Sequence, residues 1–414
     1  MKRPNVLMIA PGCDGNDVGE SWSCFQWVAG MSRQANVTLL TLRRKHQVAM
    51  QQQLPHVKVV DWSDLPFVHR FERFNSLAKP GYFHFFVKSR CWIKQQLSSG
   101  QRFDLVHQVG PLALRYPSPA AGLGLPLIIG PLAGSIATPE AFKSECGQSS
   151  WYCRFRGVDH WRLRNDPMLR HTYRSADLVI GVAPYVKELL DEVGLRRFAL
   201  ESETGVLSVA PESHARRSKN GSMRLLYVGR LIRTKGLRDV IRAMGQLHDL
   251  DSVSLDVAGD GEEWAACNEE ANRLGVAERV RFHGKVSRDQ VEALYQRSDA
   301  FVFPSFREPS GNVVFEAMRN GLPVITTKSG GPGYVVDKHS GVRLNASKPD
   351  QLAADLANTI RSLAFDVDRI ERLSRGARQR VAEIGLWPAK LDRMGDFYQS
   401  VLPPSRTLKK QRQQ

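Results

Sequence analysis

The sequence predicts an α/β fold built from two Rossmann-like, doubly wound domains. The chain has 414 residues, which is long for a single hydrophobic core. In each half, short apolar runs alternate with helical stretches, a pattern typical of parallel sheets with crossover helices. A polar segment rich in turn-forming residues, 208–222, separates the halves and is the predicted linker.

The first predicted domain, residues 1–207, begins with an apolar run at 6–10. This run is too short for a secretory signal, and we expect it to form the first strand. Helices are expected at 20–34 and 184–193. The other strands are apolar runs bounded by polar or turn-forming residues. They are expected at 37–42, 57–61, 105–108, 127–129, 178–181 and 198–201.

The second predicted domain, residues 223–385, repeats the alternation of strands and helices. Its strands are expected at 225–228, 254–258, 280–282, 300–303 and 323–326. A final helix is expected at 386–402. The tail that follows, 403–414, is basic and polar, a composition that predicts disorder.

Composition is that of a soluble globular protein, with 42% hydrophobic and 24% charged residues. No window of 18 uninterrupted apolar residues occurs, so we expect no membrane-spanning helix. The six cysteines show neither a C-x-x-C pair nor a metal-ligand spacing, which favours free thiols in a reducing compartment. We therefore expect a cytoplasmic protein.

The formal net charge of +16 is compatible with a merely basic surface, with nucleic acid and with an anionic membrane. Aromatic and basic residues are interleaved at 67–94 and again at 151–164. Such segments suit a membrane interface, and core packing with the basic residues on opposite faces is the alternative. Single strands of nucleic acid are bound by the same residue types. Because no recognisable nucleic-acid module accompanies them, nucleic acid is not an expected partner.

A pair of glutamates in the segment 308–318 carries most information about function. The segment follows the predicted strand 300–303 and enters a helix that should stop at the Asn-Gly pair 320–321. Glu308 is therefore expected on the loop at the carboxyl end of a strand, and Glu316 inside the next helix. In an open α/β sheet, ligands bind at that edge.

The start of that helix is a candidate anion site. Gly311 and Asn312 lie where free amide groups and the helix dipole favour a negative charge. Two carboxylates on either side of an anion site suit a ligand with hydroxyl groups on both sides of a phosphate, such as a nucleotide sugar. The alternative is that both glutamates belong to a solvated helix end.

Two cations upstream favour the ligand-binding interpretation. The predicted strand 225–228 breaks at Gly229, and Arg230 and Lys235 follow five residues apart. Arginine can hold a phosphate bidentately, and lysine acts as a point charge. Cations and carboxylates at the ends of two strands are hard to explain as solvated surface residues alone.

These segments together resemble the donor site of the family 4 retaining glycosyltransferases, which have the GT-B fold. Segments 229–236 and 308–316 carry the resemblance most strongly. Segment 257–262 is similar to the family's glycine turn, and 280–286 to its nucleotide-base loop. The likeness is dense over 222–345 and thinner elsewhere. It implies two Rossmann-like domains facing across a cleft, with the final helix crossing back to the first domain.

The resemblance implies a role for each matching residue. Arg230 and Lys235 would stabilise the diphosphate, Glu316 would bind the ribose hydroxyls, and Glu308 those of the donor sugar. No metal or other cofactor is implied, since the two cations take that role. Retention in this family is usually attributed to front-face attack. The implied donor-binding residues are Gly229, Arg230, Lys235, Gly259, Lys285, Val286, Glu308, Ser310, Gly311, Asn312 and Glu316, together with Gly15 and Gly19 of the first domain.

Two features of the first domain are also similar to the family. The loop 12–20, with Gly15 and Gly19, resembles the glycine loop between donor and acceptor, although a lone glycine loop is a weak signal. His107 ends a strand as the family's acceptor-side histidine does, and would join Arg230, Lys235 and Glu308 in catalysis. A core histidine with satisfied hydrogen bonds is the alternative for His107.

Three positions depart from the family pattern and leave sugar specificity open. Pro309 replaces a frequent glycine, and Tyr334 follows 330–333 where a glutamate is frequent. Segment 205–207 lacks the asparagine and aspartate that are usual at the interdomain turn.

The expected function is transfer of a hexose from a UDP- or GDP-sugar onto a growing, lipid-linked saccharide in cell-surface polysaccharide synthesis. The enzyme would be cytoplasmic, peripheral on the inner face of the membrane. The alternatives are a nucleotide-sugar epimerase, a transferase with a soluble acceptor, and a non-catalytic protein that binds nucleotide sugars or nucleic acid.

Overall fold

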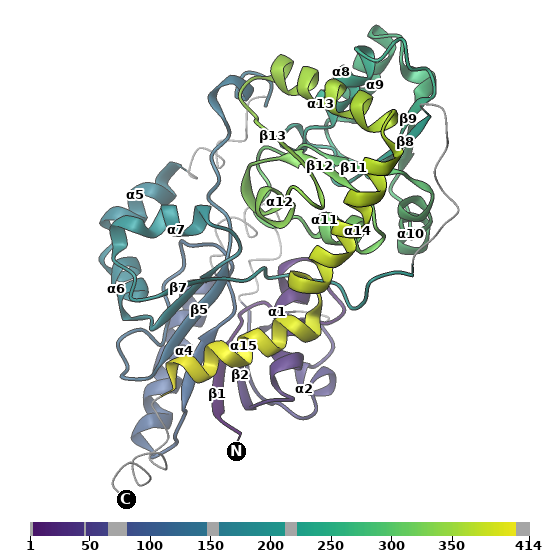
Figure 1. Cartoon of the computed structure of the whole chain (residues 1–414). Helices are drawn as coiled ribbons and strands as arrows, with labels where there is room; N and C mark the ends of the chain where they lie inside the picture. Colours follow the sequence, from purple (N-terminus) through teal and green to yellow (C-terminus); the bar gives the residue numbers. More distant parts are fainter. Residues whose placement is uncertain (1–2, 45–46, 65–80, 147–156, 212–221, 403–414) are drawn as a thin grey trace, which may run out of the picture. The chain divides into compact units, whose positions relative to one another are not determined.

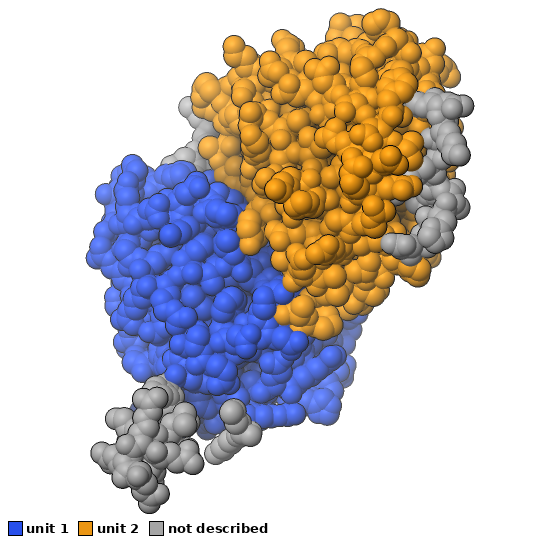
Figure 2. Space-filling view, viewed as in Figure 1, with its two compact units in different colours: residues 1–135, 151–203, 390–414 blue, residues 136–150, 204–389 orange. Residues whose placement is uncertain are grey.

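The computed structural model describes residues 3–44, 47–64, 81–146, 157–211 and 222–402. It contains two compact units (Figure 2). Unit 1 comprises residues 1–135, 151–203 and 390–414, and unit 2 comprises residues 136–150 and 204–389. Each unit is built on its own parallel sheet with helices on both faces, as the sequence predicts (Figure 1).

The sheet of unit 1 has seven parallel strands in the order β3-β2-β1-β4-β5-β6-β7. The order reverses between β1 and β4, which marks a doubly wound sheet and its switch point. The strands are β1 (Asn5–Ile9), β2 (Asn36–Arg43), β3 (Lys58–Ser63), β4 (Leu105–Gln108), β5 (Leu127–Leu132), β6 (Leu178–Gly181) and β7 (Phe198–Leu200).

The helices of unit 1 connect these strands. They are α1 (Glu20–Met31), α2 (Met50–Gln53), α4 (Gly81–Ser98), α5 (Gly157–Asn165), α6 (Pro167–Ser175), α7 (Tyr185–Leu190) and the 3-10 turn η4 (Asp191–Val193). The last helix of the chain, α15 (Trp387–Val401), packs on unit 1 from residue 390 onward. Lys390, fully buried, donates to Glu201 at 2.5 Å and anchors that helix.

The sheet of unit 2 has six parallel strands in the order β10-β9-β8-β11-β12-β13, so its switch point lies between β8 and β11. The strands are β8 (Met223–Val228), β9 (Val253–Ala258), β10 (Val280–Gly284), β11 (Ala300–Phe303), β12 (Val324–Thr327) and β13 (Gly341–Leu344). Their apolar side chains form one buried core, and β11 is buried along its whole length.

The helices of unit 2 cover this sheet. Helix α13 packs on α8, and α14 packs on α11. The full set is η2 (Glu140–Phe142), η5 (Arg233–Lys235), α8 (Leu237–Gly245), α9 (Trp264–Arg273), η6 (Ala277–Arg279), α10 (Arg288–Arg297), α11 (Asn312–Arg319), α12 (Gly330–Val335), α13 (Pro349–Ala364) and α14 (Val367–Ile384).

The unit boundaries differ from the predicted domains at the internal segment 136–150 and at residues 204–207, both predicted in the first domain and both found in unit 2. Residues 136–150, predicted in the first domain, belong to unit 2 because Phe142 is buried in the core of that unit. The predicted linker joins unit 2 at Ala210, whose backbone nitrogen donates to Arg319. Its residues 212–221 and the tail 403–414 lie outside the described residues.

The two aromatic and basic segments are only partly described. Residues 65–80 and 147–156 lie outside the described residues. In α4, Tyr82 and Phe85 are buried, whereas Phe83 is 70% exposed. Trp161 of α5 is 63% exposed. The described rings thus divide between core packing and solvent. Among the described residues, no helix is long and apolar enough to span a membrane.

Candidate functional site

Four of the five predicted charged residues of the donor site, Arg230, Lys235, Glu308 and Glu316, follow two neighbouring strands. Strands β8 and β11 pair in parallel with Phe301 beside Leu226, at the switch point of the unit 2 sheet. Arg230 and Lys235 follow β8, and Glu308 lies beyond β11 on the loop before α11. Because both strands end at the same edge, these loops meet where α/β sheets bind ligands.

A close approach of backbones shapes the loop after β8. Gly259, after β9, has φ +137, and a Cβ there would lie 1.9 Å from the carbonyl oxygen of Gly229. The amide of Gly229 donates to Ala258 at 3.0 Å, and the amide of Gly259 donates to Gly284 at 2.9 Å. Only glycine fits at position 259 without moving the loop that carries Arg230.

Lys235 ends the turn η5 and contacts the second predicted loop directly. The turn closes at Gly236, which has φ +80 and whose added Cβ would lie 2.4 Å from the carbonyl oxygen of Pro304. The Nζ of Lys235 forms an ion pair with Glu308, and both side chains are largely buried. The same Nζ lies 5.7 Å from the ring centroid of Phe303. A predicted cation and a predicted carboxylate are therefore brought together.

Arg230 differs from Lys235 in its surroundings. Its side chain is exposed, and it forms no ion pair with any residue that the structure describes. Its backbone carbonyl accepts from the amide of Ile232 at 3.0 Å, which fixes the tight turn after β8. The guanidinium group is available to an anion.

The loop that carries Glu308 is held on several sides. Thr326 donates to the carbonyl of Phe303 at 2.8 Å, and Ser305 donates to the carbonyl of Thr234 at 2.9 Å. The amide of Ser310 donates to Oε1 of Glu308 at 3.4 Å. The backbone of Glu308 accepts from the amide of Gly331 at 3.1 Å. These bonds fix where its carboxylate lies.

Glu316 lies in the middle of α11 beside a buried tyrosine. Tyr295 of α10, buried in the core, donates from its hydroxyl to Oε2 of Glu316 at 3.2 Å. Burial raises the pKa of Glu316. Gly311, the residue before α11, has φ +82 and lets the chain enter the helix. Tyr295 was not predicted from the sequence, because its place in a helical pattern is that of any core residue.

The predicted base loop follows β10. Lys285 is exposed, and Val286 packs partly against the core of unit 2. The carbonyl of Gly284 accepts from Gly259, so this loop adjoins the turn after β9. His283, just before it, contacts Asp256 at 2.5 Å.

The predicted residues of the first domain lie in unit 1. The amide of Gly15 donates to Gln53 at 2.8 Å, and Gly19 precedes α1 with φ +65. His107 is fully buried, and its ring nitrogens contact Tyr398 at 2.8 Å and the carbonyl of Gly130 at 2.7 Å. Burial lowers the pKa of His107 to about 4. This placement favours the alternative of a core histidine over contact with a substrate.

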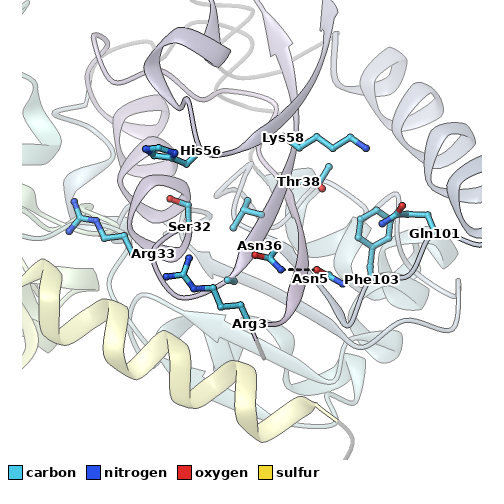
Figure 3. A pocket seen from close by; sticks show the side chains of 12 residues that line it. Arg3, Asn5, Ser32, Arg33, Asn36, Thr38, His56, Lys58, Gln101 and Phe103 are labelled. Atoms are coloured by element: carbon cyan, nitrogen blue, oxygen red, sulfur yellow. Dashed lines mark hydrogen bonds between the residues drawn. The ribbon is translucent and has the colours of Figure 1, made fainter. Parts of the chain in front are cut away.

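A separate pocket of about 590 Å³ lies in unit 1, at the amino ends of β1, β2 and β3 (Figure 3). Arg3, Arg33, His56 and Lys58 give its wall a basic character. No predicted site residue lines it. It lies at the amino edge of the unit 1 sheet, whereas Gly15 and Gly19 follow the carboxyl end of β1 in the same sheet. Within the described ranges, no three histidine, cysteine, aspartate or glutamate side chains are grouped as a metal site would need.

Comparison with known families agrees with the motifs of unit 2. Residues 210–380 match the family described as glycosyl transferases group 1. This match covers every predicted donor-site residue of unit 2 and confirms the resemblance inferred from the motifs.

Several curated relatives match part of the chain. The glycogen synthase of Mycobacterium tuberculosis is 36% identical over 175 residues, which are 42% of this chain and 41% of that protein. The lipopolysaccharide core biosynthesis glycosyltransferase LpsD of Rhizobium meliloti is 28% identical over 238 residues, 56% of this chain and 67% of that protein. The chain thus spans about two fifths of the length of the first curated relatives that it matches.

Solved structures share the fold over nearly the whole chain. Anabaena HepE, solved in complex with UDP and glucose, has a TM-score of 0.61 at 17% identity and covers 96% of this chain and 100% of its own. WaaG, a glycosyltransferase involved in lipopolysaccharide biosynthesis, has a TM-score of 0.59 at 17% identity and covers 95% of this chain and 99% of its own. The predicted fold class, with its two Rossmann-like domains, is confirmed.

Proposed function

We propose that the chain is a glycosyltransferase that binds a nucleotide-sugar donor at the carboxyl edge of the unit 2 sheet. One observation carries the proposal: Lys235 and Glu308, from two different strands, meet at the switch point of a glycosyltransferase group 1 segment. A buried cation and carboxylate at that edge form a site with opposite charges side by side. A diphosphate linked to a sugar offers matching groups for both.

The diphosphate would bind to Arg230, Lys235 and the first amides of α11. Arg230 is exposed and can hold a phosphate through two N–H groups. Lys235 can turn its Nζ from Glu308 toward a phosphate oxygen, because it is a flexible point charge. The amides of Gly311 and Asn312 point along the helix dipole toward an anion. These cations would also stabilise the charge that the leaving diphosphate gains.

The carboxylates would bind hydroxyl groups on either side of the diphosphate. Ionised carboxylates only accept hydrogen bonds, and the ribose and sugar hydroxyls can donate them. Glu316 would take the ribose hydroxyls and Glu308 those of the sugar. Gly229, Gly259, Lys285, Val286 and Ser310 would complete the wall around the nucleotide.

The reaction would retain the configuration of the sugar. The bond between the anomeric carbon and the diphosphate oxygen breaks, and its electron pair stays on the oxygen. The acceptor oxygen bonds to the same face of that carbon, and its proton passes to the departing phosphate oxygen. Since Arg230 and Lys235 supply positive charge, the reaction would proceed without a metal.

The proposed acceptor is a lipid-linked saccharide, and the donor is a UDP- or GDP-hexose. The relatives LpsD and LpsE of Rhizobium meliloti, both lipopolysaccharide core biosynthesis glycosyltransferases, support this acceptor class. Exposed Phe83 and Trp161 in a chain of net charge +16 support peripheral contact with an anionic membrane from the cytoplasmic side. The glycogen synthase relative favours a second candidate, transfer to a soluble glucan.

The proposal is tested by titrating the purified protein with UDP-, GDP-, ADP- and dTDP-hexoses and following the melting temperature. Glu316→Ala should weaken the shift that one of these donors produces, whereas Glu278→Ala, an exposed glutamate of η6, should not. Release of the nucleoside diphosphate is then measured with a membrane lipid extract and with soluble glucan. A protein that no donor stabilises, or equal shifts in both variants, would contradict the assignment.

A further inference from the structure

Residues 136–146, here called the strap, come from the first half of the chain but pack on unit 2. They follow β5 of the unit 1 sheet along the chain, yet they belong to the compact body of unit 2. The strap contains the turn η2 and the fully buried Phe142. None of its residues was predicted as functional from the sequence.

The strap joins two loops of the donor site through an aromatic and cationic stack. The ring of Phe142 lies 4.2 Å from the ring of Phe306, measured between centroids. The guanidinium carbon of Arg233 lies 5.4 Å from the Phe142 ring and 5.3 Å from the Phe306 ring. Arg233 begins the turn that ends in Lys235, and Phe306 stands two residues before Glu308. Phe142 therefore touches both loops.

A carboxylate of the strap also holds Arg233. Oε2 of Glu145 accepts from Nε of Arg233 at 2.8 Å, and its Oε1 accepts from Arg242 at 3.0 Å. Arg233 is itself only 3% exposed and is bound on its other side by fully buried Asp239, at 2.6 and 2.9 Å. Although burial would raise it, the two arginines hold the pKa of Glu145 below its ordinary value. Arg233 is thus fixed from three directions.

The other end of the strap contacts the Glu308 loop. Oγ1 of Thr138 accepts from Arg307, the neighbour of Glu308, at 3.1 Å. Ile136 lies beside Gly330, where an added Cβ would be 3.0 Å from its Cδ1. The same Cβ would lie 2.0 Å from the carbonyl oxygen of Glu308, so the strap, α12 and the Glu308 loop are packed together.

We propose that the strap is a positioning element of the donor site, which sets the places of Lys235 and Glu308 for the sugar diphosphate. This inference rests on the proposed function. Phe142 and Glu145 fix Arg233 and, through the three-residue turn η5, the backbone of Lys235. Thr138 fixes Arg307 and, through the chain, Glu308. Within the part of the chain that the structure describes, the hydrogen bonds and ring contacts of the strap given above reach Arg233, Arg307 and Phe306 and not the residues proposed to bind the nucleoside, so we place its action at the diphosphate end of the site.

The test uses calorimetric titration. It compares the affinity of UDP with that of UMP in Glu145→Gln, and the affinity of the UDP-hexose with that of UDP in Thr138→Val, because Glu308 is proposed to bind the sugar. If another base proves to bind the wild type, its diphosphate and monophosphate replace UDP and UMP. The matched control is Glu140→Gln, an exposed strap residue that forms an ion pair with exposed Lys143 of the same segment. Loss of a hydrogen bond to a charged group weakens binding by roughly 10- to 100-fold. We expect Glu145→Gln to bind UDP, and Thr138→Val to bind the UDP-hexose, roughly tenfold more weakly than the wild type, since part of the network remains.

Selectivity for the diphosphate separates positioning from a general structural role. UMP affinity should change less than about twofold, as should both affinities in the control. In a Lys235→Ala background, Glu145→Gln should add less than about twofold, because the group that it positions is gone. Glu145→Asp, which keeps the charge, should recover part of the loss.

Each outcome decides a different point. Equal losses for UDP and UMP, or losses in Glu140→Gln as large as in Glu145→Gln, would overturn the positioning role and leave a merely structural strap. Wild-type affinity for UDP in Glu145→Gln, together with wild-type affinity for the UDP-hexose in Thr138→Val, would also overturn it, while leaving the proposed function intact. A wild-type protein that binds no nucleoside diphosphate would overturn the proposed function, and the role of the strap with it.

Discussion

Substitution of Gly259 by alanine should damage the donor site through backbone displacement. The added Cβ would lie 1.9 Å from the carbonyl oxygen of Gly229. Because that neighbour is backbone, the Gly229 turn must move by about 1.5 Å to reach van der Waals contact. Positive φ at position 259 adds strain of about 1–3 kcal/mol. Arg230 is the next residue after Gly229, so its guanidinium moves too.

A displacement of this size takes Arg230 away from the phosphate and removes its charge-assisted hydrogen bonds, which predicts a loss of donor affinity on the order of 100-fold. Gly275→Ala is the matched control. Gly275 also has positive φ, +66, but its added Cβ would meet nothing within 4 Å. The control should lose about 1–2 kcal/mol of unfolding free energy and keep its donor affinity. Urea denaturation and calorimetric titration with UDP measure the two quantities. Wild-type UDP affinity in Gly259→Ala would refute the reasoning.

Three further predictions concern buried partners. Burial raises the pKa of Glu316, and the ribose hydroxyls need its ionised form, so donor affinity should fall as pH drops through that pKa and level off above it. In titrations from pH 5 to 8, donor affinity should therefore vary with pH in the wild type and stay constant in Glu316→Gln. Tyr295→Phe removes the hydroxyl that donates a hydrogen bond to Glu316. It should weaken UDP binding roughly fivefold, about 1 kcal/mol, with little change in melting temperature; an unchanged UDP affinity would show that Tyr295 contributes only to core packing. Lys390→Ala leaves buried Glu201 without its nearest cation and should cost about 3–5 kcal/mol in urea unfolding, whereas a cost under about 1 kcal/mol would contradict the anchoring of α15.

Local patterns were enough to predict the strands and the place of the main charged residues. The apolar run 300–303 is β11, and Glu308 and Glu316 lie on the following loop and helix as expected. A buried parallel strand has a simple signature, a short apolar run ended by proline or glycine, and the order of such runs predicts a doubly wound sheet. Strand β13 (Gly341–Leu344) was missed because its burial is uneven and it lies at the edge of the sheet.

Partners far apart in the sequence could not be predicted from such patterns. His107 ends a strand as a substrate-binding histidine would, but its surroundings depend on Tyr398, 291 residues later. Glu145 and Arg233 are 88 residues apart, and no local spacing relates them. The strap carries ordinary apolar and charged residues, so only its packing on unit 2 distinguishes it from a loop of the first domain.

The central claim is that Arg230 and Lys235 bind the diphosphate of a nucleotide sugar. Its most direct test is calorimetric titration of UDP- and GDP-hexoses into the wild type and into Arg230→Ala with Lys235→Ala. Arg230 is exposed, and Lys235, although largely buried, is not part of the hydrophobic core, so the double variant should keep its fold, as circular dichroism and the melting temperature will show. The account predicts saturable binding to the wild type and at least about 100-fold weaker binding to the double variant. Equal binding by a folded double variant would contradict it.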